Sequence, residues 1–159
     1  MTGVWWEYLA IFSATATVCV VLTPWAMRLA FRRNLLDHPG GHKSHDTAVP
    51  YLGGVSIVAT FSLMVVLISL IWPPHSGLRE LLVVLAMAVF LALVGLADDV
   101  RQVSPLWRIV AEIVAAVAIW SVGTGAIVTA SEPVNMGLTI LWFVGITNAF
   151  NLLDNMDGL

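Results

Sequence analysis

Long apolar segments separated by short polar ones dominate the chain. Five of them approach the roughly 20 apolar residues that a helix needs to cross the hydrocarbon core of a bilayer. They cover residues 8–27, 54–72, 81–97, 106–128 and 136–153. Each run is continuous rather than alternating, and lipid cannot satisfy open backbone groups, so the pattern predicts helices.

This pattern predicts an all-α protein, a polytopic membrane helical bundle in which residues 1–159 form a single transmembrane domain with about five spans. Composition agrees, because 59% of residues are apolar and only 11% are charged, against about 25% charged in soluble domains. The one cysteine, Cys19, excludes an internal disulfide and a cysteine-based zinc site. The N-terminus lacks the features of a signal peptide, so we expect the first run to be a retained span.

The basic residues predict an orientation. Six of the seven Lys and Arg residues follow the first or third run or lie at its edge, with Arg79 the exception. The positive-inside rule then places these two segments in the cytoplasm and the N-terminus outside. The polar clusters fall on the same predicted cytoplasmic side, which indicates an enzyme rather than a channel with ionisable groups at mid-membrane. Glu112, inside the fourth run, either lines a polar cavity or reaches the interface, and has no assigned role.

An acidic pair, Asp98 and Asp99, closes the third run. Adjacent carboxylates repel each other, and a divalent cation relieves this repulsion. Mg²⁺ prefers oxygen ligands and commonly takes one or two carboxylates together with substrate phosphates. The alternative is a solvated acidic pair at the end of a helix.

A second polar cluster closes the fifth run, where Asn148, Asn151, Asp154 and Asp157 recur at every third residue. On a helix this spacing places them along one stripe. A carboxylate at the end of a membrane helix is costly unless it faces protein, water or metal. We therefore expect the stripe to face a site; alternatively, the helix emerges into water here.

The segment after the first run combines Pro and Gly with cationic and protonatable groups, among them Lys43 and His45. A lysine point charge and backbone N–H groups suit a phosphate or diphosphate. A basic loop attracted to anionic lipid is the alternative. The pair His42 and His45 is a weak metal candidate, because zinc sites need three or four ligands.

Together these stretches resemble the polyprenyl-phosphate N-acetylhexosamine-1-phosphate transferases, a superfamily that includes phospho-N-acetylmuramoyl-pentapeptide transferase. The family's first-loop motif, D-x-P-x-x-R-K-x-H followed by P-x-x-G-G, is matched with His42 in place of Arg, at Asp37, Pro39, Lys43, His45, Pro50, Gly53 and Gly54. Its D-D-x-x-D motif is matched at Asp98 and Asp99, with Gln102 replacing the last Asp. Its N-x-x-N-x-x-D-G-x-D-G-L motif is matched, with Asn155 in place of the first Gly, at Asn148, Asn151, Asp154, Asp157, Gly158 and Leu159.

The resemblance implies an enzyme that transfers a sugar 1-phosphate from UDP-N-acetylhexosamine to undecaprenyl or another polyprenyl phosphate and releases UMP. This is a first membrane step of cell-wall, lipopolysaccharide or teichoic acid synthesis at the bacterial plasma membrane. The implied cofactor is Mg²⁺, with Mn²⁺ as the alternative. The implied partners are the two substrates and the bilayer, with no nucleic acid. The resemblance is also compatible with a homodimer. The implied catalytic residues are Asp98, Asp99, Asp154 and Asp157, of which Asp99, Asp154 and Asp157 hold the metal. The implied substrate-binding residues are Lys43, His45, Asn148 and Asn151.

Family members have about ten or eleven spans of about 20 residues each, so the resemblance implies that this chain is the N-terminal half. The alternative is an inactive truncated fragment or scaffold that binds lipid without turnover. A direct attack and a two-step path through an aspartyl-phosphate are both open, as is the choice of which aspartate acts as the base.

Overall fold

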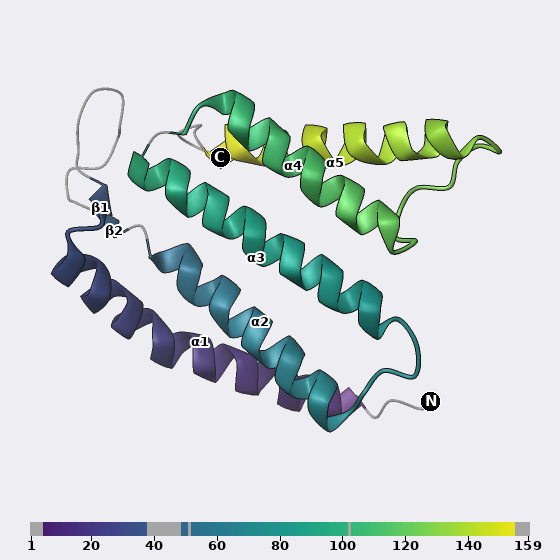
Figure 1. Cartoon of the computed structure of the whole chain (residues 1–159). Helices are drawn as coiled ribbons and strands as arrows, with labels where there is room; N and C mark the ends of the chain where they lie inside the picture. The colour runs from purple at the N-terminus through teal and green to yellow at the C-terminus, as the bar shows by residue number, and fades with distance from the viewer. Residues whose placement is uncertain (1–4, 38–48, 51, 102, 155–159) are drawn as a thin grey trace. The chain divides into compact units, whose positions relative to one another are not determined.

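The structure is a computed structural model that describes residues 5–37, 49–50, 52–101 and 103–154. These residues form five helices and one pair of two-residue strands (Figure 1). Four helices are long and apolar enough to cross a membrane: α1 (Trp5–Arg33), α2 (Gly53–Ile71), α3 (Leu78–Arg101) and α5 (Glu132–Asp154), the last over residues 132–153. The fold is therefore a polytopic membrane helical bundle, as the apolar pattern predicted.

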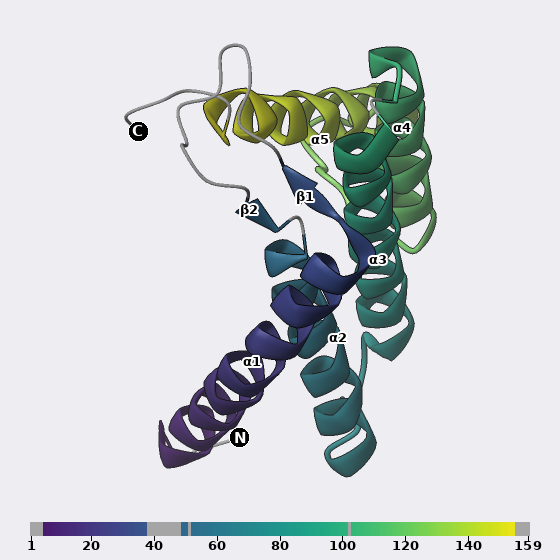
Figure 2. The same cartoon turned by 90° about the vertical axis from the view of Figure 1, so that its left-hand side faces the viewer.

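The chain divides into two compact units, Met1–Pro73 and Pro74–Leu159. In the first unit, α1 packs on α2 and ends at Arg33; the next residue, Asn34, adopts a left-handed φ of 53°. The Leu35 N–H donates to the Ala30 carbonyl, which completes a left-handed helix cap that asparagine tolerates well. Figure 2 shows that α1 and α2 converge toward the strand pair and diverge at their other ends.

The strand pair consists of β1 (Leu36–Asp37) and β2 (Val49–Pro50), which are antiparallel. Leu36 lies opposite Pro50, and Asp37 lies opposite Val49. Strand β1 follows the end of α1, and β2 comes just before α2. The segment 38–48 between the two strands contains Lys43 and His45 and lies outside the described residues.

In the second unit, α4 (Pro105–Ser121) packs against both α3 and α5. Proline at the first position of α4 is favourable there, because its fixed φ suits a helix start and its missing N–H would have no partner. Three of the buried residues of α4 are alanines, Ala111, Ala115 and Ala116. Small residues let helix backbones approach closely, which is the usual packing solution in membranes.

The predicted fourth span, residues 106–128, extends beyond the end of the helix. Helix α4 stops at Ser121, because Gly123 adopts a left-handed φ of 81° and its N–H donates to the Trp120 carbonyl. Apolar residues such as Ile127 continue the hydrophobic run beyond this point but belong to a loop. Hydropathy alone could not distinguish them from helix.

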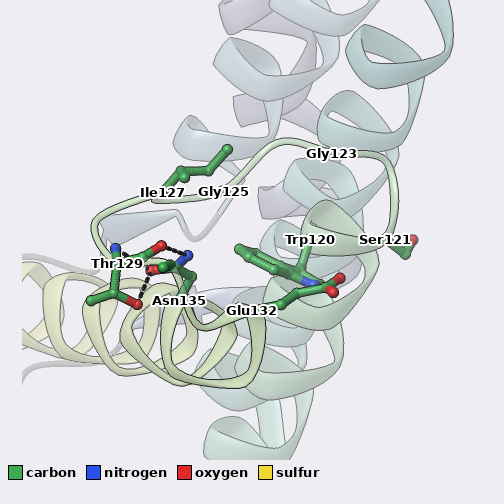
Figure 3. A pocket seen from close by; sticks show the side chains of 9 residues that line it. Trp120, Ser121, Gly123, Gly125, Ile127, Thr129, Glu132 and Asn135 are labelled. Carbon is green, nitrogen blue, oxygen red and sulfur yellow. Dashed lines mark hydrogen bonds between the residues drawn. The ribbon is translucent and has the colours of Figure 1, made fainter.

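Asn135 fixes this loop to the start of α5 (Figure 3). Its Oδ1 accepts hydrogen bonds from the backbone N–H groups of Val128 (3.1 Å) and Thr129 (2.8 Å), and its Nδ2 donates to the Thr129 carbonyl (2.8 Å). Thr139, one turn further along α5, accepts from the Ala126 N–H at 3.0 Å. The loop is thus ordered by side chains that replace the missing helical hydrogen bonds.

The large apolar side chains point away from the protein. Phe12, Leu70 and Trp142 are each more than two-thirds exposed, whereas the buried polar positions include Ser56, Thr60 and Glu112. Small and polar residues therefore occupy the helix contacts, and bulky apolar residues cover the outside. This distribution is the reverse of a soluble protein and fits a bilayer as the solvent.

A candidate transferase site on three helices

A polar cavity of about 240 Å³ lies in the second unit, among α3, α4 and α5. Its lining residues are Leu91, Val94, Gly95, Asp98, Asp99, Arg108, Glu112, Thr147 and Asn151. Both aspartates of the acidic pair lie in the last turn of α3. Residues from two separate predicted clusters, the acidic pair and the asparagine stripe, are therefore brought to the same cavity.

Asp98 pairs with an arginine from the next helix. The Arg108 Nη1 donates to the Asp98 Oδ2 at 2.9 Å, and both side chains are about one-quarter exposed. Arg108 lies in the first turn of α4, so this ion pair joins the end of α3 to the start of α4. The contact balances one of the two adjacent carboxylates with a cation.

Glu112 lies one helical turn beyond Arg108 on α4 and is only 5% exposed. Its Oε2 accepts a hydrogen bond from the Nδ2 of Asn148 on α5. The Asn148 Nδ2 also donates to the Val144 carbonyl of its own helix at 2.9 Å. Because a carboxylate only accepts, this contact fixes which end of the Asn148 amide faces α4.

Glu112 is the site residue whose role the sequence did not reveal. Its place inside an apolar run was the available signal, since ionisable residues within membrane segments usually face the protein or a polar cavity. The structure decides between the two alternatives, because Glu112 lines the cavity. Sequence spacing could not show this, since the cavity is made by three helices.

The two asparagines of the α5 stripe have different surroundings. Asn151 lines the cavity together with Thr147, one turn earlier, whose Oγ1 donates to the Phe143 carbonyl at 2.8 Å. Asn148 contacts Glu112. Asn148 therefore contacts α4 and Asn151 lines the cavity, while their roles in binding substrate stay predictions.

Four predicted site residues have no described side-chain geometry. Asp154 is the last residue of α5, but its side chain is outside the described part of the structure. Asp157, Lys43 and His45 lie wholly outside it. Their predicted roles in metal and phosphate binding stay predictions.

The cavity offers oxygen atoms of the kind that Mg²⁺ prefers. Asp99 and Asn151 supply a carboxylate and an amide oxygen on its lining. Among the described residues, no group of three or more His, Cys, Asp or Glu side chains is arranged to hold a metal. A magnesium site here would thus combine Asp99 with the predicted ligands Asp154 and Asp157 and with substrate phosphates, which suits an ion that keeps few protein ligands.

Comparison with known proteins gives the family. Residues 81–159 match the model of glycosyl transferase family 4. The chain is 33% identical over 157 residues to the undecaprenyl-phosphate alpha-N-acetylglucosaminyl 1-phosphate transferase of Thermotoga maritima, covering 97% of this chain and 45% of the relative. It is 29% identical over 157 residues to the probable undecaprenyl-phosphate N-acetylglucosaminyl 1-phosphate transferase of Bacillus subtilis, covering 93% and 42%.

A third relative has a different name. The phospho-N-acetylmuramoyl-pentapeptide-transferase of Pelobacter propionicus is 27% identical over 173 residues, covering 89% of this chain and 46% of the relative. The chain thus spans less than half the length of these relatives. No solved structure matches it significantly. The matched region includes α3, α4 and α5 with their polar cavity, and the chain belongs to glycosyl transferase family 4.

Proposed function

We propose that the natural protein carrying this chain transfers N-acetylhexosamine 1-phosphate from a UDP-sugar to undecaprenyl phosphate and releases UMP. One structural observation carries the proposal: the acidic pair of α3 and Asn151 of the α5 stripe line one cavity together with Arg108 and Glu112 of α4. The names of two relatives support undecaprenyl phosphate as the acceptor and N-acetylglucosamine as the sugar.

The reaction needs mainly positioning and charge stabilisation, as phosphoryl transfer generally does. A phosphate oxygen of the lipid forms a bond to the sugar-proximal phosphorus of the UDP-sugar. The bond from that phosphorus to the bridging oxygen breaks, and UMP leaves with the bridging oxygen. The product is a polyprenyl diphosphate sugar.

The chain's own residues have distinct tasks in this proposal. Asp99 orients or deprotonates the lipid phosphate, while Arg108 keeps the neighbouring Asp98 charge-balanced. Asn151 orients a phosphate or sugar group from the α5 side of the cavity. Lys43 and His45 neutralise phosphate charge from the segment between β1 and β2.

The proposed cofactor is Mg²⁺, held by Asp99, Asp154 and Asp157. When bound, it would neutralise negative charge on the diphosphate. Mn²⁺ prefers similar oxygen ligands and is the proposed substitute.

The proposed location is the bacterial plasma membrane, with the N-terminus outside. Arg28, Arg32 and Arg33 lie in the last two turns of α1, and Arg101 ends α3. Under the positive-inside rule these helix ends face the cytoplasm, the side from which a UDP-sugar arrives. Cysteine labelling from each side of the membrane tests this orientation.

The function is tested by measuring UMP release from UDP-N-acetylglucosamine by the natural protein in nanodiscs. We expect release only when undecaprenyl phosphate and Mg²⁺ are both present, with one polyprenyl diphosphate sugar formed per UMP. An inactive, lipid-binding membrane protein would give no UMP under any condition. UMP release without the lipid acceptor would indicate hydrolysis and would contradict the proposal.

A further inference from the structure

A second cavity lies in the first unit, between α1 and α2, and none of its lining residues has a role in the proposed transfer reaction. Its volume is about 630 Å³. It is lined by Leu22, Trp25, Ala26, Arg28, Leu29, Arg32, Val55, Ser56 and Ala59. Most of these residues are apolar, so the groove suits a hydrocarbon chain more than a water-soluble ligand.

The groove changes from apolar to cationic along α1. Leu22 and Ala26 line its apolar part, whereas Arg28 and Arg32 lie toward the end of the helix and one turn apart. The Arg28 guanidinium lies over the Trp25 ring, 5.6 Å from its centroid. An apolar slot with two cations at one end has the polarity of a phospholipid, with acyl chains in the slot and phosphate at the arginines.

The wall of the groove is held by contacts between the two helices. The Thr23 and Ser56 hydroxyls lie 3.1 Å apart across the α1–α2 contact. The Ser56 Oγ also donates to the Gly53 carbonyl at 2.7 Å, and Ser56 is 4% exposed. A groove that is formed in advance loses less entropy when a lipid binds.

The charges of Arg28 and Arg32 are accessible to a ligand. Within the described part of the chain, no carboxylate forms an ion pair with Arg28 or Arg32. Both side chains are exposed. Two exposed guanidinium groups beside an apolar groove are complementary to an anionic lipid phosphate, because arginine binds phosphate through a fixed fork of donors.

We propose that the α1–α2 groove binds an anionic glycerophospholipid, with its phosphate between Arg28 and Arg32 and an acyl chain along Leu22 and Ala26. The expected ligand is a phospholipid and not undecaprenyl phosphate. It does not depend on the proposed transferase function. Its measurement is a binding measurement, so it can fail while the transferase assay succeeds, or the reverse.

The test is native mass spectrometry of the purified natural protein titrated with phosphatidylglycerol and, separately, with phosphatidylcholine. We expect phosphatidylglycerol to bind more tightly. Each cation near a membrane surface contributes about fivefold in affinity for anionic lipid, so Arg28→Gln with Arg32→Gln should weaken binding about 25-fold. The matched control is Arg79→Gln, which removes an exposed arginine from the start of α3 and should leave binding unchanged.

A second variant tests the apolar part of the groove without changing charge. Ala59→Phe fills the slot and should reduce phosphatidylglycerol binding, while Ala10→Phe adds the same ring at an exposed position outside the groove. Equal binding of the two lipids, or unchanged binding in the double arginine variant, would overturn the proposal. Undecaprenyl phosphate displacing phosphatidylglycerol at equal concentration would also overturn it.

Discussion

The Glu112 carboxylate on α4 accepts a hydrogen bond from the Asn148 amide on α5. Glu112 also lines the cavity that contains Asp98 and Asp99. This contact therefore joins the asparagine stripe of α5 to the cavity that contains the acidic pair. It gives Glu112 a definite task, which is to hold α5 in register with α4 beside the acidic pair.

Two substitutions of Glu112 should distinguish the contribution of its hydrogen bond from the contribution of its charge. Glu112→Ala removes the hydrogen bond from the half-buried Asn148 amide to a charged acceptor on α4, which costs about 1.5–3 kcal/mol. Glu112→Gln keeps an acceptor oxygen and should retain most of the stability and turnover. Thermal unfolding in detergent and UMP release by the natural protein measure both effects. If Glu112→Gln were as damaging as Glu112→Ala, the charge and not the hydrogen bond would be the important feature.

The partner residue provides a stricter test through a double-mutant cycle. Asn148→Ala and Glu112→Ala remove opposite ends of one contact, so the double variant should be little worse than either single variant. Asn148→Asp places a second carboxylate against Glu112 and should be more destabilising than Asn148→Ala. Additive losses in unfolding free energy would show that the two residues act independently.

Arg108 should control how much magnesium the protein requires. Arg108→Gln removes a cation beside the acidic pair, so the negative charge near the proposed metal increases. We expect the Mg²⁺ concentration for half-maximal UMP release to fall about threefold to tenfold, since charges at these distances interact by about 1 kcal/mol or more. Arg108→Lys keeps the charge and serves as the control. An unchanged magnesium requirement in Arg108→Gln would place the metal elsewhere.

Gly125 should tolerate no side chain. A Cβ there would lie against the Trp120 ring, 2.7 Å from Cζ3, and 3.2 Å from the Thr139 Oγ1. Figure 3 labels both Gly125 and Trp120. Gly125→Ala should therefore lower the unfolding free energy by about 1–3 kcal/mol, the usual cost of overpacking. Gly137→Ala is the matched control, because its added Cβ meets nothing within 4 Å. Equal melting temperatures for the two variants would contradict the packing seen at Trp120.

The apolar pattern predicted most of the fold, because long apolar runs indicate which segments the bilayer surrounds. Continuous hydrophobic runs located α1, α2, α3 and α5. Helices α1, α3 and α5 are longer than their predicted spans, and α2 is shifted from its span by one residue. The end of α4 was missed, because Gly123 and Asn135 determine it through backbone conformation and hydrogen bonds rather than through hydropathy.

The site was predictable where a motif is local and not where helices meet. The three-residue spacing predicted that Asn148 and Asn151 lie along one stripe that faces a site; in the structure Asn148 contacts Glu112, and Asn151 lines the cavity. The Arg108–Asp98 ion pair and the Glu112–Asn148 hydrogen bond join residues of different helices. No spacing rule within one helix could give these contacts.

Asp99→Asn tests whether the cavity among α3, α4 and α5 is the site of sugar-phosphate transfer. The change keeps the size of the side chain and removes its charge. The measurement is the rate of undecaprenyl-phosphate-dependent UMP release by the natural protein in nanodiscs, with protein amount and melting temperature matched to the unsubstituted protein. We predict that release is abolished in Asp99→Asn. Turnover close to normal would contradict the account, because the cavity's acidic pair would then have no part in the reaction.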